Sequence, residues 1–302
     1  MPAANSPRIL VSGVSGPIGA ALLPSLTARG YQITRLVRGP ASGEGQISWD
    51  PLKPLAQESV SGFETVIHLA GESIVGRWTE GKKKRIRESR VEGTRNLSDA
   101  LAKTRNRPRV LITGSAIGYY GDRGDELLRE DSPSGQGFLP EVCRQWEAAT
   151  EPAARAWIRT VHMRTGLVLS REGGALQKML LPFRLGLGGN MGNGRQWWSW
   201  VDVQDWVGAL HHILKTELLQ GPVNVVAPRP VTNAEFTKTL AGVLSRPAIF
   251  PMPTMAARLA FGQMADELLL ASQRVEPTKL VASGYAFQYS DLRKSLEAIL
   301  VH

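Results

Sequence analysis

The sequence predicts an α/β fold: a Rossmann-type, doubly wound parallel sheet with a smaller mixed C-terminal substrate region. A short apolar strand at residues 9–11 is followed by glycines spaced G-x-x-G-x-x-G, a helical stretch at 18–26 and a second strand at 33–37. Strand-like and helix-like segments then alternate up to residue 164, which is typical of a parallel sheet covered on both faces. The 302 residues suffice for one large domain or two modest ones.

The first strand–helix unit has the features of a dinucleotide phosphate site. Gly13, Gly16 and Gly19 follow the strand, and glycines at such a turn let the backbone approach a pyrophosphate. Pro17 suits the first helical turn because that position needs no N–H donor. The helix N-terminus adds free N–H groups and a positive dipole. The alternative is a glycine-rich turn that only packs the helix against the sheet.

The end of the second strand indicates which cofactor the site takes. An acidic residue near this point holds the ribose 2′-hydroxyl of NAD, whereas an arginine accommodates the 2′-phosphate of NADP. Arg35 and Arg38 are the only charged side chains from Tyr31 to Gly39. We therefore expect NADP to be preferred over NAD, with Arg38 at its phosphate. The alternative is that Arg38 is an ordinary solvated residue at a strand end.

The remaining elements are expected in order along the chain. Strands are predicted at 47–50, 63–70, 110–113, 160–164 and 223–226, and helices at 79–102, 140–156, 200–214, 234–245, 254–272 and 291–300. Thr232 and Glu235 have the spacing of a capping box. Ligands of such sheets bind beyond the carboxyl ends of the strands. The residues predicted at those ends are Gly16, Arg38, Ala70, Ser115 and Gly166.

The character of the chain changes after residue 166. We expect residues 1–166 to form an NADP-binding Rossmann domain to which 200–228 returns, and 167–199 with 229–302 to form the smaller region. Between residues 182 and 200 the chain is rich in glycine and carries three tryptophans, which a flexible linker would not. We expect an ordered loop over the crevice, with a self-packed surface hairpin as the alternative.

Composition and charge exclude several classes of protein. No apolar run approaches the ~18 residues of a membrane span, and the N-terminus lacks the pattern of a signal peptide. A single cysteine, Cys143, excludes an intrachain disulfide, and no Cys/His cluster suggests a metal site. The net charge of +9 is densest from Lys82 to Arg90, which we interpret as a solvated helix face because no nucleic-acid module accompanies it. We expect a cytoplasmic monomer or homodimer with a small-molecule substrate, and neither nucleic acid nor membrane as partner.

Several motifs resemble those of the extended short-chain dehydrogenase/reductases, the NAD(P)-dependent epimerase/dehydratase group. Over nearly its full length the chain is most similar to an atypical branch, the epimerase family proteins, which carry a C-terminal extension from about residue 250. The motifs are Gly13–Gly19, His68–Glu72, Ser89–Arg90, Gly114–Gly121, Cys143 with Trp146–Glu147, Arg164–Gly166, Pro182–Gly194 and Trp200–Asp205.

The resemblance implies which residues form the cofactor site and which face the substrate. Those expected at the pyrophosphate are Gly13, Ser15, Gly16, Pro17 and Ile18, with Arg38 at the adenosine phosphate. Those expected beside the riboses and the nicotinamide are Leu69, Ala70, Gly71, Arg90 and Val168. Those expected on the substrate side are Glu72, Arg164, Trp197 and Trp198.

The catalytic residues are where the chain departs from this group. Related dehydrogenases use a serine, together with a tyrosine and a lysine in Y-x-x-x-K, to polarise the substrate oxygen and move the proton. Ser115 stands at the expected strand end, with Ala116 as the alternative equivalent. No lysine occurs between residues 103 and 178. If Glu147 marks the helix position of this group, the resemblance implies that Leu139 and Cys143 replace the pair.

A tyrosine after the fifth strand is the candidate replacement. Tyr119 or Tyr120 would move the proton, with Arg123 or Arg164 as the cation that stabilises a phenolate. The alternative is that both tyrosines pack at the crevice rim, because a tyrosine of pKa ~10 is a poor base at neutral pH. Cys143 is less favoured as a nucleophile, since a lone helical cysteine is usually core.

These observations lead to two functional hypotheses. The first is an NADP-dependent oxidoreductase or epimerase-like enzyme that acts on a small or sugar-like carbonyl or alcohol. The second is a non-catalytic NADP-binding protein, regulatory or structural, that has lost the tyrosine–lysine pair. The crevice and its aromatic loop favour the first hypothesis, and the lost pair favours the second.

Overall fold

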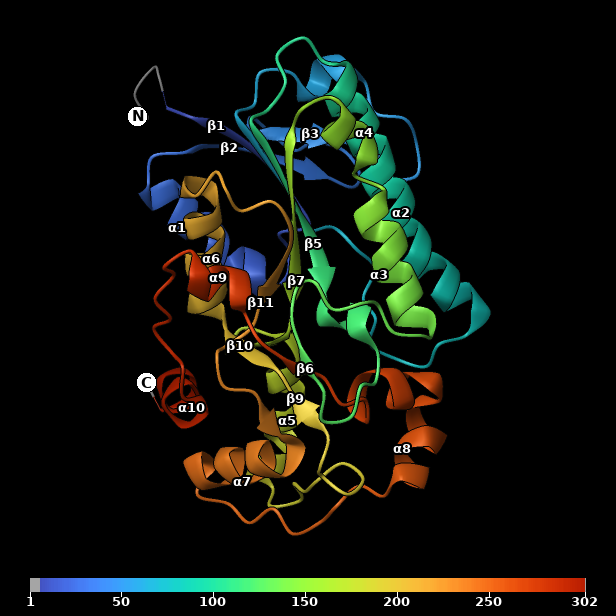
Figure 1. Ribbon diagram of the computed structural model, residues 1–302, viewed down its shortest axis with the longest axis vertical. Coiled ribbons are helices and arrows are strands. Elements are labelled where there is room, and N and C mark those ends of the chain that lie inside the picture. The colour runs from blue at the N-terminus through green and yellow to red at the C-terminus, as the bar shows by residue number, and fades with distance from the viewer. Residues whose placement is uncertain (1–5, 302) are drawn as a thin grey trace.

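The computed structural model describes residues 6–301, and a seven-stranded parallel sheet forms the centre of this part of the chain (Figure 1). The sheet order is β11-β7-β5-β4-β1-β2-β3. Its strands are β1 (Arg8–Ser12), β2 (Gln32–Val37), β3 (Gln46–Ser48), β4 (Thr65–His68), β5 (Val110–Ala116), β7 (Arg159–Thr165) and β11 (Gly221–Val225). The chain winds outward from β1 in both directions, so the predicted fold class is confirmed.

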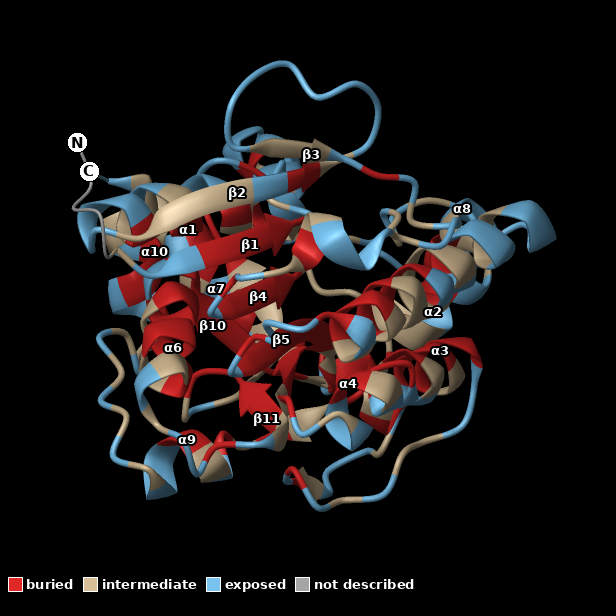
Figure 2. Cartoon of the chain, turned by 90° about the horizontal axis from the view of Figure 1, so that it is seen from above, coloured by how far each residue is buried: buried red, intermediate tan, exposed pale blue. Residues whose placement is uncertain are grey.

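Helices cover both faces of this sheet. On one face lie α1 (Pro17–Ala28) and α6 (Val203–Lys215), whose apolar sides form one core with the sheet. On the other face lie α2 (Glu80–Lys103), α3 (Phe138–Ala148) and α4 (Glu151–Arg155). Because both faces are covered, β4 is buried throughout and β1 almost throughout (Figure 2).

Three predicted helices differ from their observed bounds. The helix expected at 140–156 is divided into α3 and α4, since Pro152 sits in the first turn of a new helix. The helix expected from residue 200 begins at Val203, where the Asp202 carboxylate accepts the N–H of Gln204 as an N-cap. The helix expected at 254–272 stops as α8 (Thr254–Phe261) at Gly262, which has a φ of +61°.

The remaining elements form a smaller region below the carboxyl ends of the strands (Figure 1). Short strand pairs join β8 (Leu167–Leu169) to β10 (Trp200–Asp202), β9 (Trp197–Trp198) to β12 (Val231–Thr232), and β6 (Leu127–Leu128) to β13 (Arg274–Val275). Its helices include α5 (Gly174–Arg184), α7 (Asn233–Leu244) and α10 (Leu292–Leu300), whereas α9 (Thr278–Ala282) packs beside β11 and adds Leu280 to the core of the sheet. Single turns lie at 57–60, 117–120 and 265–269. The predicted capping box of Thr232 and Glu235 is confirmed at the start of α7.

The core of the smaller region is separate from the two cores beside the sheet. Trp200, Phe236, Leu240 and Leu296 are among its buried side chains. Strand β11 and helix α6, both within residues 200–228, belong to the sheet and to the helices that cover it. The boundaries of the two domains remain a prediction. None of the described helices combines the length and hydrophobicity that a membrane crossing requires.

One contact from the C-terminal region completes a helix of the sheet region. Gly137 precedes α3 and provides no side-chain cap. The Glu267 carboxylate instead accepts the backbone N–H groups of Phe138 and Leu139, at 3.1 Å and 2.7 Å. A carboxylate at this end also interacts favourably with the helix dipole. The start of α3 is therefore fixed by a residue 129 positions later than Phe138.

Candidate cofactor and catalytic site

The three glycines after β1 have different structural roles. Gly13 has a φ of +72°, and a Cβ atom there would lie 2.2 Å from the backbone nitrogen of Ala70. A Cβ at Gly19 would lie 2.0 Å from the carbonyl oxygen of Val14. A Cβ at Gly16 would meet nothing within 4 Å. Gly13 and Gly19 are thus required for close packing, whereas Gly16 leaves space open at the N-terminus of α1.

That N-terminus has the properties of an anion site. Gly16 is the N-cap and supplies no side-chain hydrogen bond, and the first turn contains no acidic residue. Ser15 and Gly16 are exposed, while Pro17 and Ile18 are half-buried. The N–H groups of this turn are therefore unsatisfied by side chains and are oriented toward any ligand in the open space.

Arg38, at the end of β2, is free to contact a ligand. It is exposed, and no carboxylate in the described part of the chain forms an ion pair with it. The acidic group at this edge, Glu72, is engaged instead by Lys82, whose Nζ lies 2.7 Å from Glu72 Oε1. The hydrogen bond from Lys82 lowers the pKa of Glu72, and the charges of Lys82, Arg85 and Arg38 lower it further.

Arg90 supports the turn that follows β4. Its Nη1 donates to the carbonyl oxygens of Glu72 at 2.9 Å and Ile86 at 3.2 Å, and its guanidinium lies 5.1 Å from the ring centroid of Trp146. A Cβ at Gly71 would lie 3.0 Å from Arg90 Cζ, so the guanidinium packs closely against this turn. Burial lowers the pKa of Arg90. The turn carrying Gly71 is thus held against α2.

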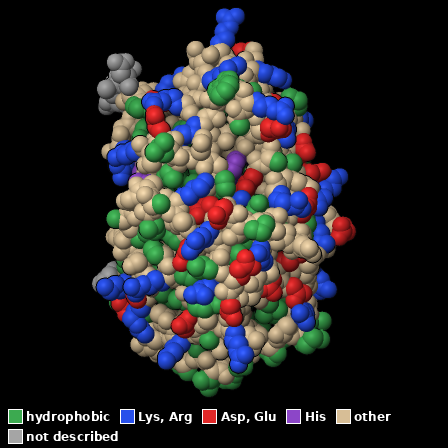
Figure 3. Space-filling view, in the orientation of Figure 1, with side chains coloured by type: hydrophobic (Ala, Val, Ile, Leu, Met, Phe, Trp, Pro, Cys, Tyr) green, Lys and Arg blue, Asp and Glu red, His purple; other side chains and the backbone are tan. Residues whose placement is uncertain are grey.

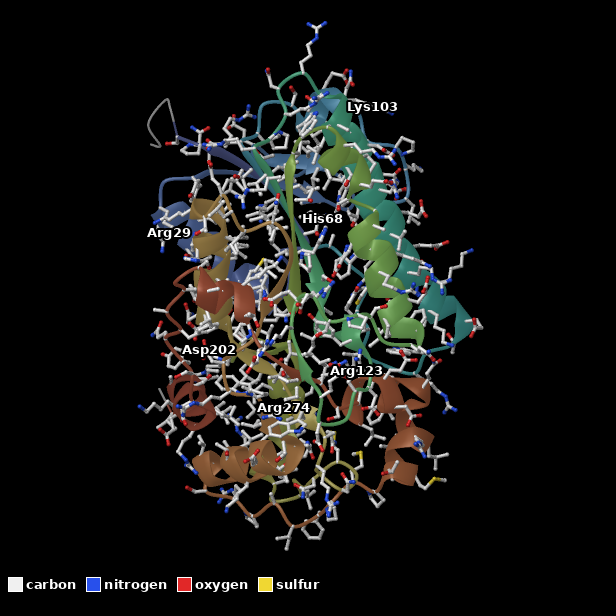
Figure 4. All side chains as sticks on the ribbon, viewed as in Figure 1. Arg29, His68, Lys103, Arg123, Asp202 and Arg274 are labelled. Atoms are coloured by element: carbon white, nitrogen blue, oxygen red, sulfur yellow. The ribbon has the colours of Figure 1, made fainter. Side chains whose placement is uncertain are left out.

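His68 is the last residue of β4, and its side chain is completely buried near the middle of the molecule (Figure 4). Its Nδ1 is 2.6 Å from the Ser12 hydroxyl, and its ring packs edge-on against Trp49. Burial lowers the pKa of His68 to about 4. The imidazole is therefore neutral at neutral pH and packs in the protein interior against Trp49.

A charged network lies at the carboxyl ends of β5 and β7. The Ser115 hydroxyl donates to Glu147 Oε1 at 2.7 Å. Arg164 holds the same carboxylate with two hydrogen bonds, Nε to Oε1 at 2.8 Å and Nη2 to Oε2 at 2.9 Å. Burial lowers the pKa of Arg164, but the hydrogen bond and charge of Glu147 outweigh this effect and hold the pKa above its ordinary value. Arg164 is thus a fixed buried cation.

The two candidate tyrosines occupy different environments. Tyr120 is fully buried, accepts a hydrogen bond from Arg164 Nη1 at 3.0 Å and donates to Asn224 Oδ1 at 2.7 Å. Burial raises the pKa of Tyr120 to about 12. Tyr119 is half-buried, with the Arg164 guanidinium 3.5 Å from its ring centroid. Of the two cations considered for them, Arg164 contacts both rings, whereas Arg123 pairs with Glu126.

No chemical role for Glu147 was predicted from the sequence. It was used only as part of a Trp-Glu motif that marks the helix on which the tyrosine–lysine pair is expected. The two residues in place of that pair, Leu139 and Cys143, are buried. Burial raises the pKa of the Cys143 thiol to about 12, so the thiolate needed for nucleophilic attack is not formed at neutral pH.

The aromatic loop is ordered by a distant segment. The backbone N–H groups of Phe250 and Met252 donate to the carbonyl oxygens of Gly188 and Asn190, at 3.1 Å and 2.8 Å. Trp198 packs in the core of the smaller region, edge-on against Phe236. This burial separates Trp198 from the substrate side on which it was expected.

Trp197, the other tryptophan expected on the substrate side, is half-buried. Its Nε1 donates to Asp125 at 2.8 Å, and the Arg274 guanidinium lies 4.7 Å from its ring centroid. Figure 4 places Arg274 and Arg123 just beyond the strand ends. Within residues 6–301, no group of three or more His, Cys, Asp or Glu side chains has the arrangement of a metal site.

Two segments of the chain match known protein families. Residues 9–226 match the NAD dependent epimerase/dehydratase family, and residues 252–299 match a domain of unknown function, DUF1731. The chain is 38% identical over 290 residues to epimerase family protein Mb2239 of Mycobacterium bovis, which covers 95% of this chain and 96% of that protein.

Two solved structures resemble the whole chain. The crystal structure of human epimerase family protein SDR39U1 (isoform 2) with NADPH has a TM-score of 0.90 and 36% identity, covering 98% of this chain and 99% of that one. A nucleoside-diphosphate sugar epimerase from Corynebacterium glutamicum has a TM-score of 0.82 and 36% identity, covering 98% of this chain and 58% of that one. The chain therefore belongs to the NAD dependent epimerase/dehydratase family, in the branch of epimerase family proteins that carry the C-terminal DUF1731 domain.

Proposed function

We propose that this protein is an NADP-dependent oxidoreductase or epimerase-like enzyme acting on a small or sugar-like carbonyl or alcohol. The observation that carries the proposal is the network of Ser115, Glu147, Arg164 and Tyr119 at the carboxyl ends of β5 and β7. These ends lie on the same edge of the sheet as the open turn at Gly16. The NADPH in the human relative and the sugar epimerase relative support the cofactor and the substrate class.

The residues present fit a dinucleotide phosphate. The open space at Gly16 and the unsatisfied N–H groups of α1 suit the pyrophosphate, and the unpaired Arg38 suits the 2′-phosphate. When bound, NADP supplies or accepts a hydride. The residues we propose to hold it are Gly13, Ser15, Gly16, Pro17, Ile18, Arg38, Leu69, Ala70, Gly71, Arg90 and Val168.

The chain's own groups then orient the substrate and move its proton. The Ser115 hydroxyl donates its hydrogen bond to Glu147, so its oxygen is left to accept a hydrogen bond from a substrate hydroxyl. The hydroxyl of Tyr119 gives a proton to, or takes one from, the reacting substrate oxygen. Arg164 lies under the Tyr119 ring and stabilises negative charge there. Glu147 holds both Ser115 and Arg164 in place.

The second candidate function is non-catalytic NADP binding. The observations that favour it are the full burial of Tyr120 and the burial of Leu139 and Cys143, where relatives with redox chemistry have the pair. In this case the network would be structural, and NADP would act as a ligand that stabilises or signals. A turnover assay separates the two functions.

Tyr119→Phe is expected to lower kcat by ~10²-fold, the usual share of general acid–base catalysis, and to leave NADPH binding unchanged. The assay is cofactor absorbance against a panel of alcohols, carbonyls and nucleotide sugars. Tyr120→Phe is the matched control: it removes a buried hydroxyl and lowers stability, but the folded variant keeps its kcat. Full activity in Tyr119→Phe would place the proton transfer elsewhere. Tight NADPH binding without turnover of any panel member by the native protein would favour the non-catalytic function.

Arg38→Ala is expected to weaken NADPH binding ten-fold or more, because a charge-assisted contact contributes about 1.5–3 kcal/mol. NADH binding should hardly change, since NADH lacks the 2′-phosphate. Calorimetric titration of both cofactors measures the difference. Arg35→Ala, an exposed arginine of the same strand, is the control and should affect neither. An equal loss for NADPH and NADH would contradict the assignment.

A further inference from the structure

One end of the molecule exposes an apolar surface that the proposed site does not use. It is formed by residues 181–187, at the end of α5, and by residues 249–259, which include part of α8; we call it the α5–α8 surface. Eight of the fourteen large hydrophobic side chains exposed in the described residues belong to it. They are Leu181, Leu185, Leu187, Ile249, Phe250, Met252, Met255 and Leu259. A contiguous patch of this kind marks a contact surface, unlike single exposed side chains.

Hydrogen bonds make the two segments one surface. The loop after α5 is joined to residues 250–252 by the backbone bonds described above, and the N–H of Gly192 also donates to the carbonyl oxygen of Met252 at 2.9 Å. Closer to α5, Arg246 Nε donates to the carbonyl oxygen of Arg184 at 3.1 Å. The exposed apolar side chains therefore lie on adjoining, mutually fixed pieces of backbone.

Helix α8 is apolar on the side that faces solvent. Met255 and Leu259, one turn apart, are 73% and 79% exposed, whereas Ala257 is buried toward the protein. A helix with its polar side outward needs no further partner, but α8 presents its large hydrophobic residues outward. Figure 2 shows α8 projecting from the body, and Figure 3 shows hydrophobic side chains on the surface in this part of the molecule.

The sequence segments that contain and flank this surface are basic. Residues 173–201 and 236–265 contain no aspartate or glutamate. Their basic residues, all exposed, are Lys178, Arg184, Arg195, Lys238, Arg246 and Arg258. Of these, Arg258 pairs with Asp266.

The basic start of α2 adjoins this surface. Arg77 Nη1 donates to the carbonyl oxygen of Leu259 at 3.4 Å and so connects the two. From Glu72 to Arg90 the chain has seven basic and three acidic residues. Lys82, Lys83, Lys84 and Arg85 pair with the three glutamates of this segment, which still carries a net positive charge beside the apolar surface.

We propose that the α5–α8 surface docks on an anionic lipid bilayer. Its leucine, methionine and phenylalanine side chains would enter the interfacial layer, and the surrounding lysines and arginines would contact the headgroups. A second copy of the chain is disfavoured, because a self-contact would oppose like charges in a protein of net charge +9. A folded protein partner is disfavoured because α8 projects instead of lining a groove. Peripheral docking needs no spanning segment, on whose absence the expectation of no membrane partner was based.

Flotation of the intact protein with lipid vesicles tests the proposal. We expect it to float with vesicles of phosphatidylcholine containing roughly a third phosphatidylglycerol, and to remain below with phosphatidylcholine alone. High salt should weaken the binding, because it screens headgroup attraction. Failure to float with the anionic vesicles, or equal binding to both vesicle types, would overturn the proposal.

Matched variants identify the surface that binds. Met255→Gln with Leu259→Gln should reduce flotation ten-fold or more, since both side chains would have been buried in lipid. Leu218→Gln, at a site 92% exposed outside the surface, is the control and should float as the native protein does. Analytical ultracentrifugation serves as the second readout. A native dimer that the double variant converts to a monomer would overturn the proposal in favour of a self-contact, and unchanged flotation of the double variant would overturn it outright.

Discussion

Glu147→Gln is expected to lower the free energy of unfolding by about 3–5 kcal/mol, because it leaves the Arg164 guanidinium buried without its counter-charge. The two side chains are only 12% and 3% exposed, so solvent screens their interaction little. The substitution also weakens the hydrogen bond that Ser115 donates. Urea unfolding followed by circular dichroism measures the change as a lower midpoint concentration.

The neighbouring helix provides the control for this experiment. Glu151 in α4 pairs with Arg155, but these side chains are 51% and 77% exposed. Glu151→Gln should therefore change the free energy of unfolding by less than ~1 kcal/mol. Replacing both members of the buried pair, Glu147→Leu with Arg164→Met, should recover part of the lost stability, since no unpaired charge remains. A Glu147→Gln variant with the native midpoint would contradict this account.

Gly16→Val is expected to weaken NADPH binding ~10²-fold or more and to leave the melting temperature unchanged. Its φ of −98° suits a branched residue, and a Cβ there would meet nothing within 4 Å in the protein. The valine side chain would instead fill the space where we place the pyrophosphate. That anion would lose charge-assisted contacts with the N–H groups of α1, each contributing about 1.5–3 kcal/mol.

Gly19→Ala is the matched comparison three residues later. Its Cβ would lie 2.0 Å from the carbonyl oxygen of Val14, so α1 would have to move away from the preceding turn. We expect this variant to lose stability, and to lose cofactor binding only as a consequence. Calorimetric titration and thermal unfolding of both variants distinguish the two effects. Native NADPH affinity in Gly16→Val would exclude the cofactor from this turn.

The sheet could be predicted from sequence because its strands and first helix have local patterns. The apolar run before Gly13 and the glycine spacing define the first unit without reference to any other segment. The smaller region could not be predicted in the same detail. Strands such as β6 and β13 have two residues each and exist because they pair with each other across the chain. Helix α5 was missed, since Gly173, Gly174 and Pro182 have the composition of a loop.

Only those residues of the candidate site that lie at the ends of sheet strands could be predicted from the sequence. Ser115 and Arg164 were placed at neighbouring strand ends, and in the structure both contact one carboxylate. That carboxylate, Glu147, comes from α3, and its position depends on packing between the helix and β5. The distinction between Tyr119 and Tyr120 depends on burial, which adjacent residues of the same type do not reveal in sequence.

The cap that Glu267 provides for α3 has a consequence during protein synthesis. All seven strands of the sheet precede residue 226, so they are translated before Glu267. Until then the first N–H groups of α3 lack their carboxylate partner. Glu147 lies on this helix, so the charged network gains its final support only after Glu267 has been synthesised. A nascent chain released before residue 267 would contain every strand of the sheet but would lack the cap that fixes the helix beside its crevice.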